Sequence, residues 1–223
     1  MNKKESYKFY RGCHRFAGPV IRFFRPFTVI GGENMQSGAA LVCSNHSAMI
    51  DPFLIALAFG IDTHVHVITK IELFKIPLIS TLLWKLGMIS VDRSINDIAS
   101  IRNSLTYLKK GEKVVIFPEG TRASRHDEAS AKIGAIRIAE HSGVPIIPVF
   151  IPRRKPFFVK SRIAFGEPYQ IRKLPVKRTA DDYRVLTEEL MDKIQALDGF
   201  REKGEGRRGK NAGRKGKSMG RST

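Results

Sequence analysis

The chain has only two cysteines, Cys13 and Cys43, among its 223 residues. Two cysteines cannot make the disulfide framework of a small secreted domain, and they do not supply a zinc site by themselves. The composition therefore favours a reducing, cytosolic setting. Acidic residues are also scarce, because 21 Asp and Glu oppose 39 Lys and Arg and leave a net charge of +18.

Long hydrophobic runs are missing as well. A helix that spans a membrane needs about 20 consecutive, predominantly apolar residues. The most apolar windows are 53–61, which is too short, and 76–91, which is interrupted by Pro77 and Lys85. The sequence therefore predicts no segment that crosses a membrane.

The excess positive charge is concentrated in two segments. Residues 1–36 carry seven basic and two acidic residues, and residues 201–223 carry nine and two, so together they hold twelve of the eighteen net charges. Residues 201–223 have too few apolar side chains to offset the entropy of folding. We expect a disordered basic tail there. It is either a solubilising appendage or a ligand for anionic lipid, nucleic acid or an acidic protein.

Residues 5–30 interleave aromatic and basic side chains. Gly18-Pro19 and Pro26 predict that this segment forms two short helices. Such amphipathic helices either pack their aromatic faces on the core or dock on a membrane, with the basic side chains against phosphate headgroups. RNA binding through stacked aromatic rings is a third interpretation, and it lacks a recognisable module.

From residue 39 onward, short apolar strands alternate with helical patterns. This alternation predicts an α/β fold, with a mostly parallel mixed sheet flanked by helices. The expected domains are N-terminal amphipathic helices over 1–30, an α/β domain over 31–200 and the basic tail over 201–223. Strands are predicted at 39–43, 63–69, 87–91, 113–117, 144–151 and 162–165, and helices at 52–59, 95–110, 131–142 and 181–197.

Polar residues interrupt the apolar pattern at strand ends, which is where α/β proteins build their sites. His46 and Asp51 lie five residues apart across a predicted strand-to-helix turn. The Asp51 carboxylate can contact one ring nitrogen of His46, and the other ring nitrogen can then take a proton from a hydroxyl group. The histidine and aspartate of a nucleophilic triad work in this way. The alternative is structural, with His46 capping the turn and Asp51 capping the next helix.

Two further polar clusters follow predicted strands. Between Phe117 and Arg122, Gly120 lets a ligand approach the backbone, whose N–H groups can hold an anion or an oxyanion. Arg122 adds a bidentate fork for phosphate. The other cluster spans residues 87–93 and ends in Asp92-Arg93. Taken alone, such a pair is typical of a surface ion pair.

Four short segments follow one another in the order of a known set of motifs. They are Asn45-His46-xxxx-Asp51, Gly87-xxx-Val91-Asp92-Arg93, Phe117-Pro118-Glu119-Gly120-Thr121-Arg122 and Val144-Pro145-Ile146-Ile147-Pro148-Val149. Together they resemble the four motif blocks of the glycerolipid acyltransferases with the HxxxxD motif, most closely the 1-acylglycerol-3-phosphate (lysophosphatidic acid) O-acyltransferases. The resemblance covers about residues 28–170, and it favours the catalytic interpretation of His46 and Asp51.

The resemblance implies a glycerol-3-phosphate acyltransferase-like fold and specific roles for residues. His46, held by Asp51, would deprotonate the free glycerol hydroxyl as it attacks an acyl thioester. No metal and no cofactor would be needed beyond acyl-CoA or acyl-carrier protein as co-substrate. The site for the acceptor phosphate would be formed by Arg93, Glu119, Gly120, Thr121 and Arg122.

The resemblance also implies partners and a location. A lysophospholipid acceptor, a thioester donor and an anionic membrane surface would be the partners, with no nucleic acid. The protein would lie peripherally or monotopically on the cytoplasmic face of the membrane, docked by its N-terminal helices, and residues 76–89 would line the groove for the acyl chain. Other interpretations are an acyltransferase for another lysolipid, a basic nucleic-acid-binding protein and a silent lipid-binding relative. The second lacks a nucleic-acid-binding signature, and the presence of His46 and Asp51 disfavours the third.

Overall fold

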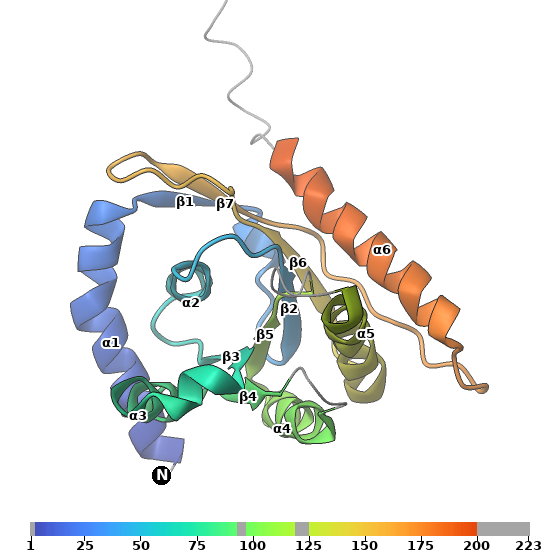
Figure 1. Ribbon diagram of the computed structural model, residues 1–223. Helices are drawn as coiled ribbons and strands as arrows, with labels where there is room; N and C mark the ends of the chain where they lie inside the picture. The colour runs from blue at the N-terminus through green and yellow to red at the C-terminus, as the bar shows by residue number, and fades with distance from the viewer. Residues whose placement is uncertain (1–2, 93–96, 119–124, 200–223) are drawn as a thin grey trace, which may run out of the picture.

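The computed structural model describes residues 3–92, 97–118 and 125–199 (Figure 1). Within these residues, seven strands form one sheet in the order β1-β7-β6-β2-β5-β3-β4. Neighbouring strands run parallel except for β6 and β7. The mostly parallel mixed sheet is therefore confirmed. The strands are β1 (Phe27–Ile30), β2 (Ala40–Ser44), β3 (Val65–Lys70), β4 (Ile89–Val91), β5 (Lys113–Ile116), β6 (Ile146–Phe150) and β7 (Ser161–Phe165).

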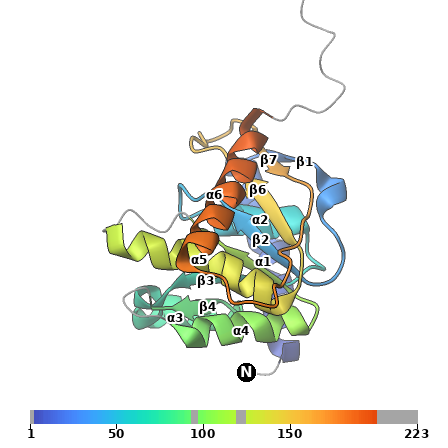
Figure 2. The same cartoon turned by 90° about the vertical axis from the view of Figure 1, so that its right-hand side faces the viewer.

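Helices flank the sheet, as predicted. The α-helices of the described residues are α1 (Lys3–Phe24), α2 (Asp51–Phe59), α3 (Pro77–Lys85), α4 (Ile98–Lys109), α5 (Arg125–Ser142) and α6 (Ala180–Ala196). Short 3₁₀ turns are η1 (Gly32–Asn34), η2 (Ile71–Lys75) and η3 (Leu197–Gly199). α1 and α2 lie on one side of the sheet, and α4, α5 and α6 lie on the other, where Figure 2 shows them in front of it.

The central strand β2 explains why the sequence there is an unbroken apolar run. All five of its residues are buried, and successive side chains of a strand point to opposite faces. Ala40 and Val42 belong to the core that includes α2, whereas Leu41 and Cys43 belong to the core that includes α5 and α6. A strand covered on both faces has no polar side, so it shows no alternation.

The N-terminal segment forms one helix, which corrects the prediction of two. α1 continues through Gly18-Pro19 and ends at Phe24, before Pro26. Proline in a helix removes one hydrogen bond and crowds the preceding turn. Tertiary packing holds this helix in place despite that cost. At Gly18, α1 approaches α2 so closely that an added Cβ would lie 3.0 Å from Leu57 Cδ2.

Other element boundaries also differ from the prediction. Phe27–Ile30, expected within the docking helices, forms β1 and pairs in parallel with β7. α3 arises within a window that we expected to be an apolar groove. α4 begins at Ile98, because the Asp97 carboxylate accepts a hydrogen bond from the backbone N–H of Ser100 at 3.0 Å and caps the helix. The predicted basic tail, 201–223, lies outside the described residues.

Gly31, at the end of β1, provides a test of how this edge of the sheet packs. Its φ is 70°, and an added Cβ would lie 2.1 Å from the carbonyl oxygen of Phe165. Replacing Gly31 by Ala should lower the free energy of unfolding by about 3 kcal/mol, because backbone strain and a backbone clash add together. Urea denaturation measures this change.

Gly143 supplies the matched control. Its φ is 67°, but nothing lies within 4 Å of the added Cβ. Gly143→Ala should therefore cost only about 1 kcal/mol, from backbone strain alone. Equal losses in the two variants would contradict the close contact between Gly31 and β7.

Candidate active site

The turn between β2 and α2 carries His46 at the carboxyl edge of the sheet. Asn45 anchors this turn to the segment that follows β6. Its side-chain amide donates to the carbonyl oxygen of Ile151 at 2.7 Å and accepts from the Ile151 N–H at 2.8 Å. Both hydrogen bonds are buried, so Asn45 fixes the backbone next to His46.

Asp51, the first residue of α2, holds the same turn from the other side. Its side chain is fully buried. Oδ2 accepts hydrogen bonds from the backbone N–H groups of Ser47 at 2.7 Å and Ala48 at 2.8 Å, and it lies 3.2 Å from His46 Nδ1. The carboxylate thus holds the turn, as the structural interpretation expected, and also faces the imidazole, as a catalytic pair requires.

The His46 ring is held between Asp51 and an aromatic neighbour. The ring of Phe117, just after β5, lies 4.4 Å from it, measured between centroids. The side chain of His46 is 29% exposed. Because the two ring nitrogens lie on opposite sides of an imidazole, Nε2 is directed away from Asp51. The arrangement is suited to proton transfer at Nε2.

Lys155 is a member of this site that the sequence did not single out. Its Nζ lies 2.9 Å from Asp51 Oδ1 and donates to Ser47 Oγ at 2.7 Å and to the carbonyl oxygen of Pro152 at 2.6 Å. The side chain is only 2% exposed. In the sequence it ends the basic run Arg153-Arg154-Lys155, which is typical of a solvated surface, so no local signal marks it.

The charge of Asp51 follows from these contacts. Burial raises the pKa of the carboxyl group. Hydrogen bonds from His46, from Lys155 and from the backbone N–H groups of Ser47 and Ala48 lower it further than burial raises it, to about 2. Asp51 is therefore a carboxylate at neutral pH, and an imidazolium formed at His46 would face a fixed negative charge.

The residues expected to bind phosphate, Arg93, Glu119, Gly120, Thr121 and Arg122, lie outside the described residues. The strands that lead to them are described. β5, which leads to residues 119–122, is paired directly with β2. β4, which leads to Arg93, is three strands from β2 in the sheet order. At strand spacings of about 4.8 Å, that separation is roughly 14 Å.

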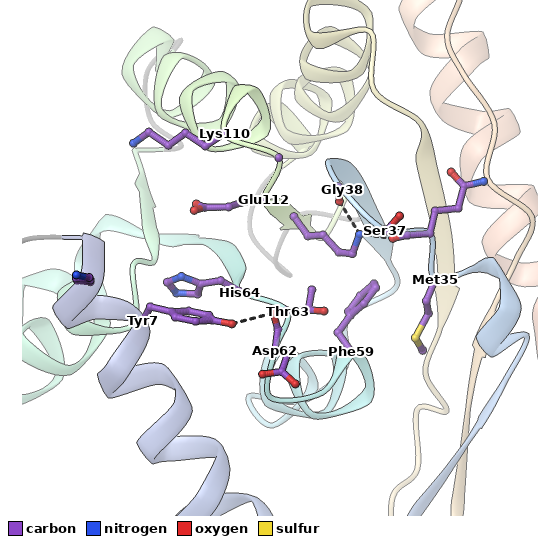
Figure 3. A pocket seen from close by; sticks show the side chains of 14 residues that line it. Tyr7, Met35, Ser37, Gly38, Phe59, Asp62, Thr63, His64, Lys110 and Glu112 are labelled. Atoms are coloured by element: carbon purple, nitrogen blue, oxygen red, sulfur yellow. Dashed lines mark hydrogen bonds between the residues drawn. The ribbon is translucent and has the colours of Figure 1, made fainter.

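A second polar cluster lies at the opposite edge of the sheet, beside a pocket near the start of β3 and β5 (Figure 3). Among the described residues, His64, His66 and Glu112 form the one group whose side-chain atoms could together hold a metal ion, with those atoms within 4.8 Å of one another. Figure 3 shows His64 and Glu112 near Tyr7, whose hydroxyl donates to the carbonyl oxygen of Asp62 at 2.9 Å.

The hydrogen bonds of His66 account for this cluster without an ion. Nδ1 lies 2.7 Å from the carbonyl oxygen of Gly87, and Nε2 lies 2.8 Å from Glu112 Oε2. Both ring nitrogens of His66 therefore have a polar partner within the protein. His66 thereby ties β3 to the turn before β4 and to the turn before β5, which is a structural role.

The buried charge of Asp51 makes stability depend on pH. Asp51→Asn should lower the free energy of unfolding by about 3 kcal/mol at pH 7, because Lys155 would stay buried without its counter-ion. An aspartate whose pKa falls on folding, here from 3.8 to about 2, stabilises the protein above the unfolded-state pKa, and that contribution is lost as the pH falls through the folded-state value. The difference between the two proteins should therefore shrink from about pH 4 to pH 2 in urea denaturation.

Asp62 is the matched control, because its side chain is 79% exposed and its one described ion pair, with Arg11, is also exposed. Asp62→Asn should change the free energy of unfolding by less than about 1 kcal/mol. A penalty for Asp51→Asn that stays constant down to pH 2 would show that the charge of Asp51 is not what stabilises the turn.

Known proteins resemble this chain in sequence and in fold. The family model described as Acyltransferase matches residues 26–152, more than half of the chain. A 1-acyl-sn-glycerol-3-phosphate acyltransferase of Bacillus subtilis is 29% identical over 85% of this chain and 96% of its own length. One of Borreliella burgdorferi is 31% identical over 60% of this chain and 54% of its own length, so the chain spans about half of that relative.

A solved structure agrees on the fold. The 1-acyl-sn-glycerophosphate (LPA) acyltransferase of Thermotoga maritima aligns with a TM-score of 0.60 over 91% of this chain and 85% of its own, at 23% identity. The family match contains the whole His46–Asp51 turn, β5 and β6. The chain therefore belongs to the acyltransferase family.

Proposed function

We propose that the chain transfers a fatty acyl group from a thioester to the free hydroxyl of 1-acylglycerol-3-phosphate and so makes phosphatidic acid for phospholipid biosynthesis. The observation that carries this proposal is the contact of 3.2 Å between His46 Nδ1 and Asp51 Oδ2 at the carboxyl edge of the sheet. The names of the relatives from B. subtilis and B. burgdorferi support this choice of acceptor.

The proposed reaction needs one base. His46 Nε2 takes the proton of the acceptor hydroxyl while the hydroxyl oxygen attacks the carbonyl carbon of the thioester. Asp51 stabilises the imidazolium that results. The tetrahedral intermediate collapses, the C–S bond breaks, and the leaving thiolate takes the proton back from His46. The products are a new ester and a free thiol.

The co-substrates follow from this scheme. Acyl-CoA or acyl-carrier protein would supply the thioester, and the proton and electron balance closes without a metal ion or a bound cofactor. Arg93 and Arg122 would hold the acceptor phosphate by charge-assisted hydrogen bonds, with Glu119, Gly120 and Thr121 around it. The pairing of β5 with β2 supports a position near His46 for residues 119–122 alone, because they follow the strand whose end contacts His46.

His46→Ala tests the reaction. Acyl transfer to lysophosphatidic acid in phospholipid vesicles should fall roughly 10³-fold, because the general base is lost. Acyl-CoA and acyl-carrier protein serve as parallel donors, and circular dichroism checks the fold. His141→Ala is the control, since His141 is an exposed histidine of α5 and its loss should leave the rate unchanged.

Two results would overturn the proposal. A His46→Ala variant that keeps most of the rate would exclude His46 as the base. Wild-type protein that acylates another lysolipid but not lysophosphatidic acid would exclude the proposed acceptor.

We also infer that the protein acts at a membrane surface, docked through what we call the apolar ridge: Phe16, Val20, Phe23, Phe24 and residues 157–159. These side chains are exposed, Phe16 by 77% and Phe23 by 68%. The two parts of the ridge lie side by side, because the Phe158 N–H donates to the carbonyl oxygen of Phe24 at 2.9 Å. Exposed apolar surface of this kind marks an interaction site.

Basic groups border the apolar ridge. The guanidinium of Arg25 lies 3.8 Å from the centre of the Phe157 ring, and that of Arg22 lies 4.5 Å from the centre of the Phe27 ring. Rings at the acyl boundary with cations beside them suit a surface of anionic phospholipid. None of the described helices has the length and apolar character to cross a bilayer.

The double variant Phe16→Ser/Phe23→Ser tests this docking. It should weaken binding to vesicles of anionic phospholipid on the order of 100-fold, because the membrane would no longer bury two aromatic rings that are exposed in the free protein. Flotation of the protein with vesicles measures the binding. Val176→Ser is the control, since Val176 is 77% exposed but lies in the loop before α6. Equal binding by all three proteins would exclude the apolar ridge as the docking surface.

A further inference from the structure

We infer that Lys155 is a positioning residue: it orients the Asp51 carboxylate and offsets its charge, so that His46 stays neutral and can accept a proton at neutral pH. This inference rests on the proposed role of His46 as the general base. It assigns a function to a lysine that lies beyond the four sequence motifs.

The surroundings of Lys155 are those of a fixed ammonium group. An ammonium has three N–H donors and no acceptor. Nζ has three acceptors around it, at 2.6 Å (the carbonyl oxygen of Pro152), 2.7 Å (Ser47 Oγ) and 2.9 Å (Asp51 Oδ1). A buried charge is costly unless it is paired and hydrogen-bonded, and here Nζ makes two hydrogen bonds and one ion pair. Lys155 is thus built into the site.

Lys155 completes the set of groups that face Asp51. The backbone N–H groups of Ser47 and Ala48 and the His46 ring face Oδ2, and the Lys155 ammonium faces Oδ1. Ser47 contacts both charged groups: its N–H and its hydroxyl face Asp51 Oδ2, at 2.7 and 3.4 Å, and the hydroxyl also accepts a hydrogen bond from Lys155. Removing the ammonium would leave a buried carboxylate oxygen without its cation.

The positive charge of Lys155 affects how well His46 can act as a base. A lone carboxylate beside an imidazole favours the imidazolium, which raises the pKa of the histidine. An imidazole that is already protonated cannot accept the proton of an alcohol. The ammonium of Lys155 neutralises the carboxylate on its other side, so a proton on His46 adds a charge that is not fully compensated. Asp51 can then orient His46 without keeping it protonated.

Lys155→Gln is the sharpest test, because glutamine removes the charge and keeps a donor for Asp51 Oδ1. NMR titration of His46 in the full chain, without substrate, should show its pKa rising by about one unit, as expected for a charge removed from a nearby buried site. The rate of acyl transfer should fall about fivefold at pH 6.5 and recover above about pH 8.5, where the more basic His46 is neutral again.

Lys155→Met, which removes both the charge and the donor, should shift the pH profile in the same direction. If it does not fold, Lys155→Gln decides. Lys173→Gln, at an exposed lysine before α6, is the control and should leave both the titration and the rate unchanged.

The outcomes separate this inference from the proposed function. A rate that falls by the same factor at every pH, with the titration of His46 unmoved, would make Lys155 merely structural and overturn the inference. Wild-type protein that does not acylate lysophosphatidic acid would instead overturn the acceptor assignment. The titration of His46 would still decide the role of Lys155, because it needs no turnover.

Discussion

One buried negative charge, that of Asp51, organises the candidate active site. Its carboxylate is shielded from water, so the protein must supply the donors that water would otherwise provide. Two backbone N–H groups, an imidazole and an ammonium face it. These donors come from the turn after β2 and from the segment after β6. The contacts with one carboxylate therefore hold two parts of the chain together that are distant in the sequence.

The parallel arrangement of the strands determines where this point lies. β2, β5 and β6 run in the same direction and leave the sheet at the same edge. His46, Phe117 and Lys155 follow these three strands, and they meet although they are far apart in the sequence. The opposite edge holds the His66–Glu112 contact, which joins turns. The candidate active site and the His66–Glu112 contact thus lie at opposite edges of the sheet.

Local sequence predicts the elements of this fold better than it predicts the contacts between them. The unbroken apolar run of β2 and the His46–Asp51 spacing both reflect neighbours along the chain, and both could be recognised. Lys155 could not, because its burial depends on β6 lying beside β2. The single helix α1 could not be predicted for a similar reason: Gly18 lies close to Leu57 of α2, and the local signal of Gly18-Pro19 does not reveal that tertiary contact.

The bridge between Asn45 and Ile151 has a consequence for how the protein is made. The two residues are 106 positions apart, so the turn that carries His46 cannot acquire its final geometry until β6 has left the ribosome and paired with β2. During synthesis the chain therefore exposes its HxxxxD segment long before that segment is ordered. The geometry of the candidate site is therefore complete only when the second half of the domain has folded.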